Sequence, residues 1–133
     1  MSLFVDTSAL YATMDRDDEF HVRASAHWKA CLSGSEVLLT SNYILVETMA
    51  LVQSRLGMEA TRLLANDVMP ALEIEWVSAD DHRTALEAVL AAGRRSLSFV
   101  DCTSFQVMRR LGLRSAFAFD PHFGEQGFHV TPA

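Results

Sequence analysis

The fold is decided by the opening stretch Leu3-Phe4-Val5-Asp6-Thr7-Ser8-Ala9-Leu10. Three apolar residues lead directly into a carboxylate and two hydroxyls, and an apolar run compatible with a helix follows. This pattern predicts a short buried strand that ends at Asp6, and a helix capped by Thr7 or Ser8. A charge at the end of a buried strand is costly without a partner, and ligands bind at this edge of open α/β sheets. Asp6 therefore needs a partner there.

The composition is that of one globular domain over residues 1–133, with half of its residues apolar and about a fifth charged. No apolar run reaches the roughly 20 residues of a membrane span, and the first residues do not resemble a signal peptide. We therefore expect a soluble, cytoplasmic protein without a membrane partner. Cys31 and Cys102 are too few and too far apart for a metal knuckle or a disulfide framework, so both are expected to be reduced.

The net charge of -6 argues against bulk electrostatic binding to nucleic acid. The basic residues are nevertheless clustered, because five of them lie close together in the last third of the chain: Arg94, Arg95, Arg109, Arg110 and Arg114. A charged run is usually a solvated face. As a group, these residues are a candidate for a rim that faces phosphates.

Hydrophobic periodicity predicts strands that alternate with helices along the rest of the chain. The further strands are expected at residues 37–40, 72–76, 115–119 and 128–130, of which 72–76 has one wetter face and suits a sheet edge. Helices are expected at residues 9–14, 21–32, 43–56, 58–68, 78–92 and 98–111. The predicted class is α/β, with a central parallel sheet of four to five strands covered by helices on both faces.

Three further acids occupy settings that resemble that of Asp6. Asp120 follows an apolar strand, Asp101 stands three residues after Ser98 in a capping-box pattern, and Glu47 lies in the helix after the second strand. Because the carboxyl ends of parallel strands and the helix starts that follow share one edge, we expect the four acids to meet there. Each alone has a plainer reading as a helix cap, a capping box, a turn or an exposed helical acid.

A cluster of four acids requires a cation. Like charges about 4 Å apart repel by roughly 4 kcal/mol at an effective dielectric constant near 20. Oxygen ligands without His or Cys suit Mg²⁺ or Mn²⁺, and such ions held by Asp and Glu cut phosphodiester bonds. The chain offers no Ser-His-Asp or Cys-His arrangement for a protein nucleophile.

Four segments resemble the motifs of PIN-domain ribonucleases: Phe4 to Leu10, Ser41 to Glu47, Ser98 to Cys102, and Phe119-Asp120-Pro121-His122-Phe123. Their order, their spacing and the chain length are most similar to VapC toxins of toxin–antitoxin pairs. The resemblance implies a PIN-like domain whose catalytic, metal-holding residues are Asp6, Glu47, Asp101 and Asp120. It also implies that Thr7 or Ser8 orients Asp6.

The function implied by this resemblance is Mg²⁺- or Mn²⁺-dependent hydrolysis of single-stranded or loop RNA, leaving a 3′-hydroxyl and a 5′-phosphate. A cognate antitoxin and a homodimer are implied as partners, and the apolar helices around residues 21–32 and 43–68 could supply either surface or only the core. The RNA backbone would be flanked by the basic rim at Arg94, Arg95, Arg109 and Arg110. For His122 we expect a structural hydrogen bond rather than a phosphate contact.

Two other functions are compatible with parts of the pattern. A haloacid-dehalogenase-like phosphatase also begins with an Asp at the end of its first strand, but it needs a second Asp where this chain has Ser8. A PIN fold that binds RNA or protein without catalysis is the other alternative, and the presence of all four acids disfavours it.

Overall fold

A single parallel sheet forms the centre of the protein, whose computed structural model describes all 133 residues. Its strands are β1 (Ser2–Val5), β2 (Val37–Ser41), β3 (Glu73–Glu75), β4 (Ser115–Phe117) and β5 (His129–Thr131). They lie in the order β3-β2-β1-β4-β5, and every neighbouring pair is parallel. The predicted parallel α/β sheet is confirmed, including the position of residues 73–75 at an edge.

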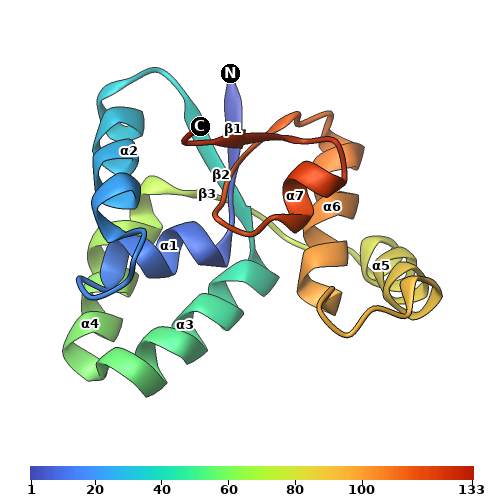
Figure 1. Ribbon diagram of the computed structural model, residues 1–133, viewed down its shortest axis with the longest axis horizontal. Helices are drawn as coiled ribbons and strands as arrows, with labels where there is room; N and C mark the ends of the chain where they lie inside the picture. Colours follow the sequence, from blue (N-terminus) through green and yellow to red (C-terminus); the bar gives the residue numbers. More distant parts are fainter.

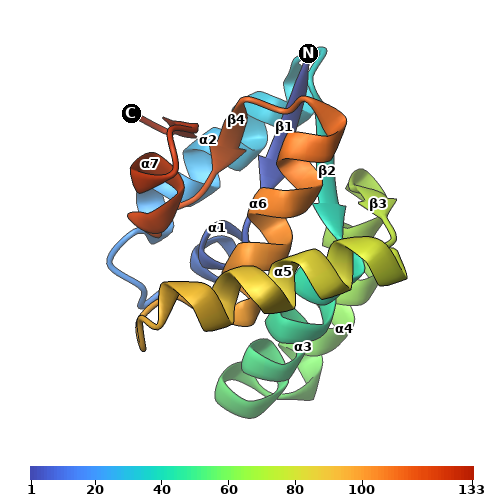
Figure 2. The ribbon, with the colours of Figure 1, turned by 90° about the vertical axis from the view of Figure 1, so that its right-hand side faces the viewer.

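Helices cover both faces of this sheet, as predicted. They are α1 (Thr7–Met14), α2 (His21–Ser33), α3 (Asn42–Leu56), α4 (Met58–Leu63), α5 (Ala79–Ala92), α6 (Phe99–Leu111) and α7 (His122–Glu125). Figures 1 and 2 show α1 and α2 on one face, with α5 and α6 on the other, while α3 extends beyond the carboxyl ends of the strands. None of the helices is long and apolar enough to cross a membrane.

Strand β1 is the middle of the sheet and of the core. Leu3, Phe4 and Val5 are all buried, because β2 and β4 flank the strand on both sides and helices cover both faces. A strand in this position reads as a continuous apolar run. The strand ends at Val5, so the next residue, Asp6, lies at the centre of the carboxyl edge of the sheet.

Serine side chains cap three of the longer helices at their N-termini. Ser41, Ser78 and Ser98 accept hydrogen bonds from the first turns of α3, α5 and α6, which satisfies backbone N–H groups that have no helical partner. Helix α1 differs from the prediction. Its cap is Asp6 rather than Thr7 or Ser8, because Asp6 keeps an extended backbone and accepts from the Ser8 N–H group.

Two predicted elements have clearly different bounds in the structure, and one short helix is additional. The helix expected at 58–68 ends at Leu63 and widens into a π-helical turn over Leu64–Val68, which is followed by a 3₁₀ turn over Met69–Ala71 with Pro70 in its first turn. Strand β4 ends at Phe117 rather than at residue 119, and the Phe119 N–H group donates to Ser8 Oγ of α1. The helix α7 was not predicted.

The edge strand β3 also differs from its predicted pattern. The alternation of residues 72–76 implied an apolar side that packs inward, but Ile74 is 38% and Trp76 70% exposed. Only Leu72, which precedes the strand, is buried. The three-residue strand lies at the edge of the sheet and pairs only with β2. Little of the structure therefore covers the side chains of Ile74 and Trp76.

We expect truncation of the central strand to be severe. Phe4 is fully buried, and its ring centroid lies 6.4 Å from that of Phe123 in α7. Phe4→Ala should lower the free energy of unfolding by about 3–5 kcal/mol through lost burial and a residual cavity, as measured by urea denaturation. Leu90→Ala is the matched control, since Leu90 is 73% exposed, and an equal loss in both variants would contradict this account of the core.

Candidate active site

The four predicted acids line one open cleft of about 480 Å³ at the carboxyl edge of the sheet. Asp6 follows β1 and Asp120 follows the neighbouring strand β4. Asp101 stands in the first turn of α6, and Glu47 in the second turn of α3. Figure 1 shows the starts of α1 and α3 at the lower ends of β1 and β2. The parallel sheet thus brings together acids that are widely separated in sequence.

Asp6 is the most deeply buried of these acids, with 4% of its surface exposed. Its Oδ2 atom accepts hydrogen bonds from the Ser8 N–H group at 3.1 Å and from Ser8 Oγ at 2.6 Å. Burial raises the pKa of Asp6 to about 7; the Ser8 hydrogen bonds lower it, and the charges of Asp101 and Asp120 raise it further. Asp6 is therefore costly to ionise without a cation.

Asp101 and Asp120 are each held by a local backbone hydrogen bond. Asp101 Oδ2 accepts from the Ser98 N–H group at 3.1 Å in a complete capping box, and Asp120 Oδ1 accepts from the His122 N–H group at 2.8 Å. Burial raises the pKa of Asp101; the Ser98 hydrogen bonds lower it, and the charge of Asp120 raises it. These causes show that the negative charges of Asp6, Asp101 and Asp120 act on one another.

The free oxygens of these carboxylates fit a hard cation. In each of Asp6, Asp101 and Asp120, one oxygen is fixed by protein hydrogen bonds and the other accepts none. The only buried side-chain oxygen or nitrogen without a partner is Ser104 Oγ, so the free oxygens of Asp6 and Asp101 remain open to solvent. An all-oxygen donor set is the chemistry that Mg²⁺ and Mn²⁺ select. No three of these acids, however, form a preformed group that could hold a metal ion.

The two hydroxyls after Asp6 have separate contacts. Ser8 Oγ donates to Asp6 and accepts from the Phe119 N–H group at 2.9 Å, so it links the end of β1 to the segment that carries Asp120. Thr7 instead accepts a hydrogen bond from Thr48 Oγ1 at 3.1 Å, which ties α1 to α3. Of the two candidates for orienting Asp6, Ser8 is the one that contacts it.

The cleft extends beyond the acids to residues that the sequence analysis missed, among them Tyr11, Asp18, Phe20, Leu51 and Arg55. Phe20 stacks on Phe119 with ring centroids 4.6 Å apart. A sequence signal existed for one wall, because Leu51 and Arg55 follow Glu47 at intervals of four on the same helix. The loop before α2 carries no comparable signal.

The predicted basic rim is not part of this cleft. Arg94 pairs with Glu125 at 3.1 Å, and Arg110 pairs with both Asp81 and Glu75 at 2.8 and 2.9 Å. These guanidinium groups are held by acids remote in sequence, so their positions do not support the predicted role.

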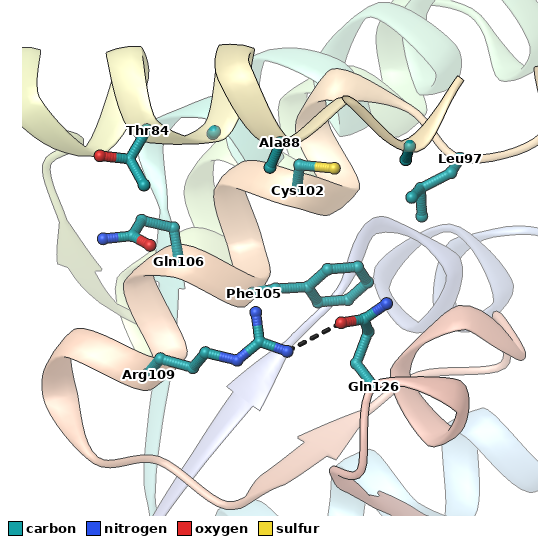
Figure 3. Close-up of a pocket in the computed structure, with 10 residues that line it drawn as sticks. Thr84, Ala88, Leu97, Cys102, Phe105, Gln106, Arg109 and Gln126 are labelled. Atoms are coloured by element: carbon teal, nitrogen blue, oxygen red, sulfur yellow. Dashed lines mark hydrogen bonds between the residues drawn. The ribbon is translucent and has the colours of Figure 1, made fainter. Parts of the chain in front are cut away.

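The other two arginines of the rim also lie outside the lining of the cleft. Arg109 projects into a separate cavity between α5 and α6, where it donates to Gln126 Oε1 at 2.8 Å (Figure 3). Arg95 is exposed in the loop before α6. The structure therefore brings none of the four predicted arginines to the acids.

His122 lies in the cleft wall with a structural contact, as expected. Its side chain is buried, and the Nε2 atom lies 2.9 Å from the Ser96 carbonyl oxygen, so an N–H group there donates to it. Both cysteines are free and buried, in agreement with the expected reduced state.

Comparison with known proteins identifies the family. The model of the PIN domain family matches residues 3–128. The chain belongs to the PIN domain family. It is 38% identical over 127 residues to the 23S rRNA-specific endonuclease VapC20 of Mycobacterium tuberculosis, with 95% of each chain covered. The predicted resemblance to PIN-domain ribonucleases of the VapC type is confirmed, and the haloacid-dehalogenase alternative is excluded.

Solved structures agree with this PIN-domain assignment. The crystal structure of M. tuberculosis VapC20, described as a sarcin–ricin loop cleaving toxin, matches with a TM-score of 0.84 and 37% identity over 95% of both chains. VapBC2 from Rickettsia felis, bound to a DNA fragment from its promoter, matches with a TM-score of 0.71 over 98% of this chain and 97% of that one. Its 11% identity supports the fold alone. As a PIN-domain nuclease, the protein is an enzyme that acts on phosphodiester bonds, and such nucleases generally depend on a divalent metal.

The buried Asp6 predicts how the stability of the metal-free protein depends on pH. The pKa of Asp6 in the folded protein, about 7, lies above the ordinary value of 3.8, so the folded state binds this proton more tightly than the unfolded state does. The stability that this adds is fully present below pH 3.8 and is lost as the pH rises through 7. The free energy of unfolding in chelator should fall over this range by at most about 4 kcal/mol. Asp6→Asn should reduce the fall, because Asn still caps the helix but carries no charge.

Urea denaturation at a series of pH values measures this effect. Asp17→Asn is the control, since it removes the charge of an exposed acid outside the cleft and should leave the profile of the wild-type protein unchanged. An Asp6→Asn profile parallel to that of the wild type would contradict the assignment of this pH dependence to the buried carboxyl of Asp6.

Proposed function

We propose that residues 1–133 act as one PIN domain that is the endoribonuclease toxin of a toxin–antitoxin pair, and that its substrate is the sarcin–ricin loop of 23S rRNA. The observation that carries the activity is the set of three aspartates that each present one free oxygen to the same cleft. The 38% identity to VapC20 over nearly the whole chain supports the substrate. A ribosomal RNA target also suits a cytoplasmic protein.

In this proposal, Asp6, Glu47, Asp101 and Asp120 hold Mg²⁺ or Mn²⁺. When bound, the divalent ion supplies Lewis-acid activation of water and offsets the charge that develops on the phosphoryl group. Ser8 fixes one oxygen of Asp6 and leaves the other for the ion. The capping box does the same for Asp101, so both side chains are oriented before the ion binds.

Cleavage of rRNA tests this assignment. Asp101→Asn should lower the rate of cleavage of a sarcin–ricin loop RNA by at least about a hundredfold, since even partners outside the metal shell contribute up to that amount. The capping box tolerates Asn, so the fold should remain. Mapping of the cleaved 23S rRNA by primer extension, in Mg²⁺, in Mn²⁺ and in chelator, gives the readout.

Asp80→Asn is the matched control for cleavage, because Asp80 lies on the surface of α5 with its side chain 88% exposed, outside the cleft. Cleavage that persists in chelator would refute metal dependence. RNA binding by the wild-type protein without any cleavage would instead favour the non-catalytic PIN module.

The proposed partners are a cognate antitoxin and a second copy of the chain. The identity of 37% to VapC20, which is described as a toxin, supports the antitoxin. For the homodimer we propose the outer face of α3, where Val46 is 70% exposed beside an apolar hollow of about 410 Å³ that Leu45, Met49 and Met69 line with it. Exposed apolar surface of this kind is typical of interfaces.

A charge on this face of α3 should prevent dimerisation. Val46→Asp is expected to shift the protein from dimer to monomer in sedimentation equilibrium, because the carboxylate would be buried without a partner in the interface. Val22→Asp is the control, since Val22 is 79% exposed on α2. A wild-type protein that sediments as a monomer, or a Val46→Asp variant that remains dimeric, would rule out this interface.

A further inference from the structure

We infer that Arg55, supported by Tyr11, forms a second RNA subsite in the catalytic cleft and binds a phosphodiester next to the one that is cut. The inference rests on the proposed ribonuclease function and adds to it a residue that holds the substrate backbone. The four arginines predicted from the sequence do not line this cleft, so its phosphate contact must come from elsewhere.

Helix α3 carries Arg55 along the same wall as the acid Glu47. Glu47, Leu51 and Arg55 are spaced by four residues, so they share one face of the helix, and all three line the cleft. Eight residues of α-helix rise about 12 Å. Arg55 therefore stands at the far end of the cleft, within reach of a neighbouring nucleotide while the cut bond lies at the acids.

The charge of Arg55 is unusual in its surroundings. It is the only Arg or Lys in the lining, among five carboxylates: Asp6, Asp18, Glu47, Asp101 and Asp120. The ion pairs of the chain use Arg83, Arg94 and Arg110, and Arg55 belongs to none. An exposed guanidinium that has no acid partner is free to bind a phosphate by donating two hydrogen bonds, the bidentate geometry that arginine favours.

Tyr11 holds this guanidinium in place from α1. The Arg55 Cζ atom lies 5.4 Å from the centroid of the Tyr11 ring, a cation–π arrangement. The ring itself is anchored, because Tyr11 Oη donates to Asp15 Oδ2 at 2.8 Å. Since the side chain of Arg55 is already ordered, less conformational entropy is lost when it binds an anion. Tyr11 is thus a positioning residue, and Arg55 is the one that contacts the RNA.

The salt dependence of RNA binding tests the subsite. The dissociation constant of a fluorescent sarcin–ricin loop RNA is measured in chelator, to prevent cleavage, over a series of KCl concentrations. Arg55→Gln should weaken binding roughly tenfold, and should lower the slope of log K against log salt by about 0.7, the value for one phosphate on a single strand. Arg55→Lys should keep the slope and lose part of the affinity.

Arg62→Gln is the matched control, because Arg62 is an exposed arginine on α4 outside the cleft, and it should leave the slope unchanged. A purely structural role for Arg55 predicts a lower thermal midpoint with an unchanged slope. That result would overturn the subsite, as would equal slopes for the Arg55→Gln and Arg62→Gln variants, or no measurable binding by the wild-type protein.

Cleavage kinetics separate this inference from the proposed function. With Mg²⁺ or Mn²⁺, Arg55→Gln should raise KM for the loop RNA and change kcat little, whereas loss of a metal-holding acid lowers kcat. If the wild-type protein cuts the RNA but Arg55→Gln does so with an unchanged KM, the subsite is wrong and the nuclease function stands. If the wild-type protein does not cut, the proposed function fails.

Discussion

The buried carboxylate of Asp6 at the end of the central strand is the constraint on which the rest of the site depends. β1 is flanked by strands on both sides and covered on both faces, so its end delivers this charge into a place where ionisation is costly; burial raises the pKa of Asp6 to about 7. Asp120 lies just after the neighbouring strand β4, and Asp101 lies in the capping box of α6. A stable parallel sheet thus concentrates negative charge at its own carboxyl edge, which protonation of Asp6 or a bound cation would relieve.

The same local interactions that stabilise the fold also orient the site. Asp6 caps α1 and Asp101 completes the capping box of α6, but each uses only its Oδ2 atom for these bonds. The plainer structural reading of these residues and the functional one are therefore not exclusive. One oxygen serves the helix and the other remains for a ligand, which explains how charged residues can occupy these positions at little cost to local structure.

The sequence predicted the parts of the site that follow from local signals. Strand ends, serine caps and the Ser98–Asp101 spacing are read within a few residues, and parallel topology then places the four acids on one edge. The basic rim could not be judged in this way, because the partners of Arg110 are Asp81 and Glu75, which lie 29 and 35 residues away. The outward Trp76 and the short α7 depend equally on tertiary cover that no local pattern encodes.

An acidic protein that acts on a polyanion must rely on charges at short range. At physiological ionic strength, interactions between exposed charges are screened beyond about 8 Å, so the net charge of -6 acts weakly on an RNA that already lies in the cleft. In the proposed complex, what matters is the balance between the cleft carboxylates, the ion they would hold and the guanidinium of Arg55. With a divalent ion bound at the acids and Arg55 about 12 Å along α3 at the other end, the cleft would present two cations to the backbone.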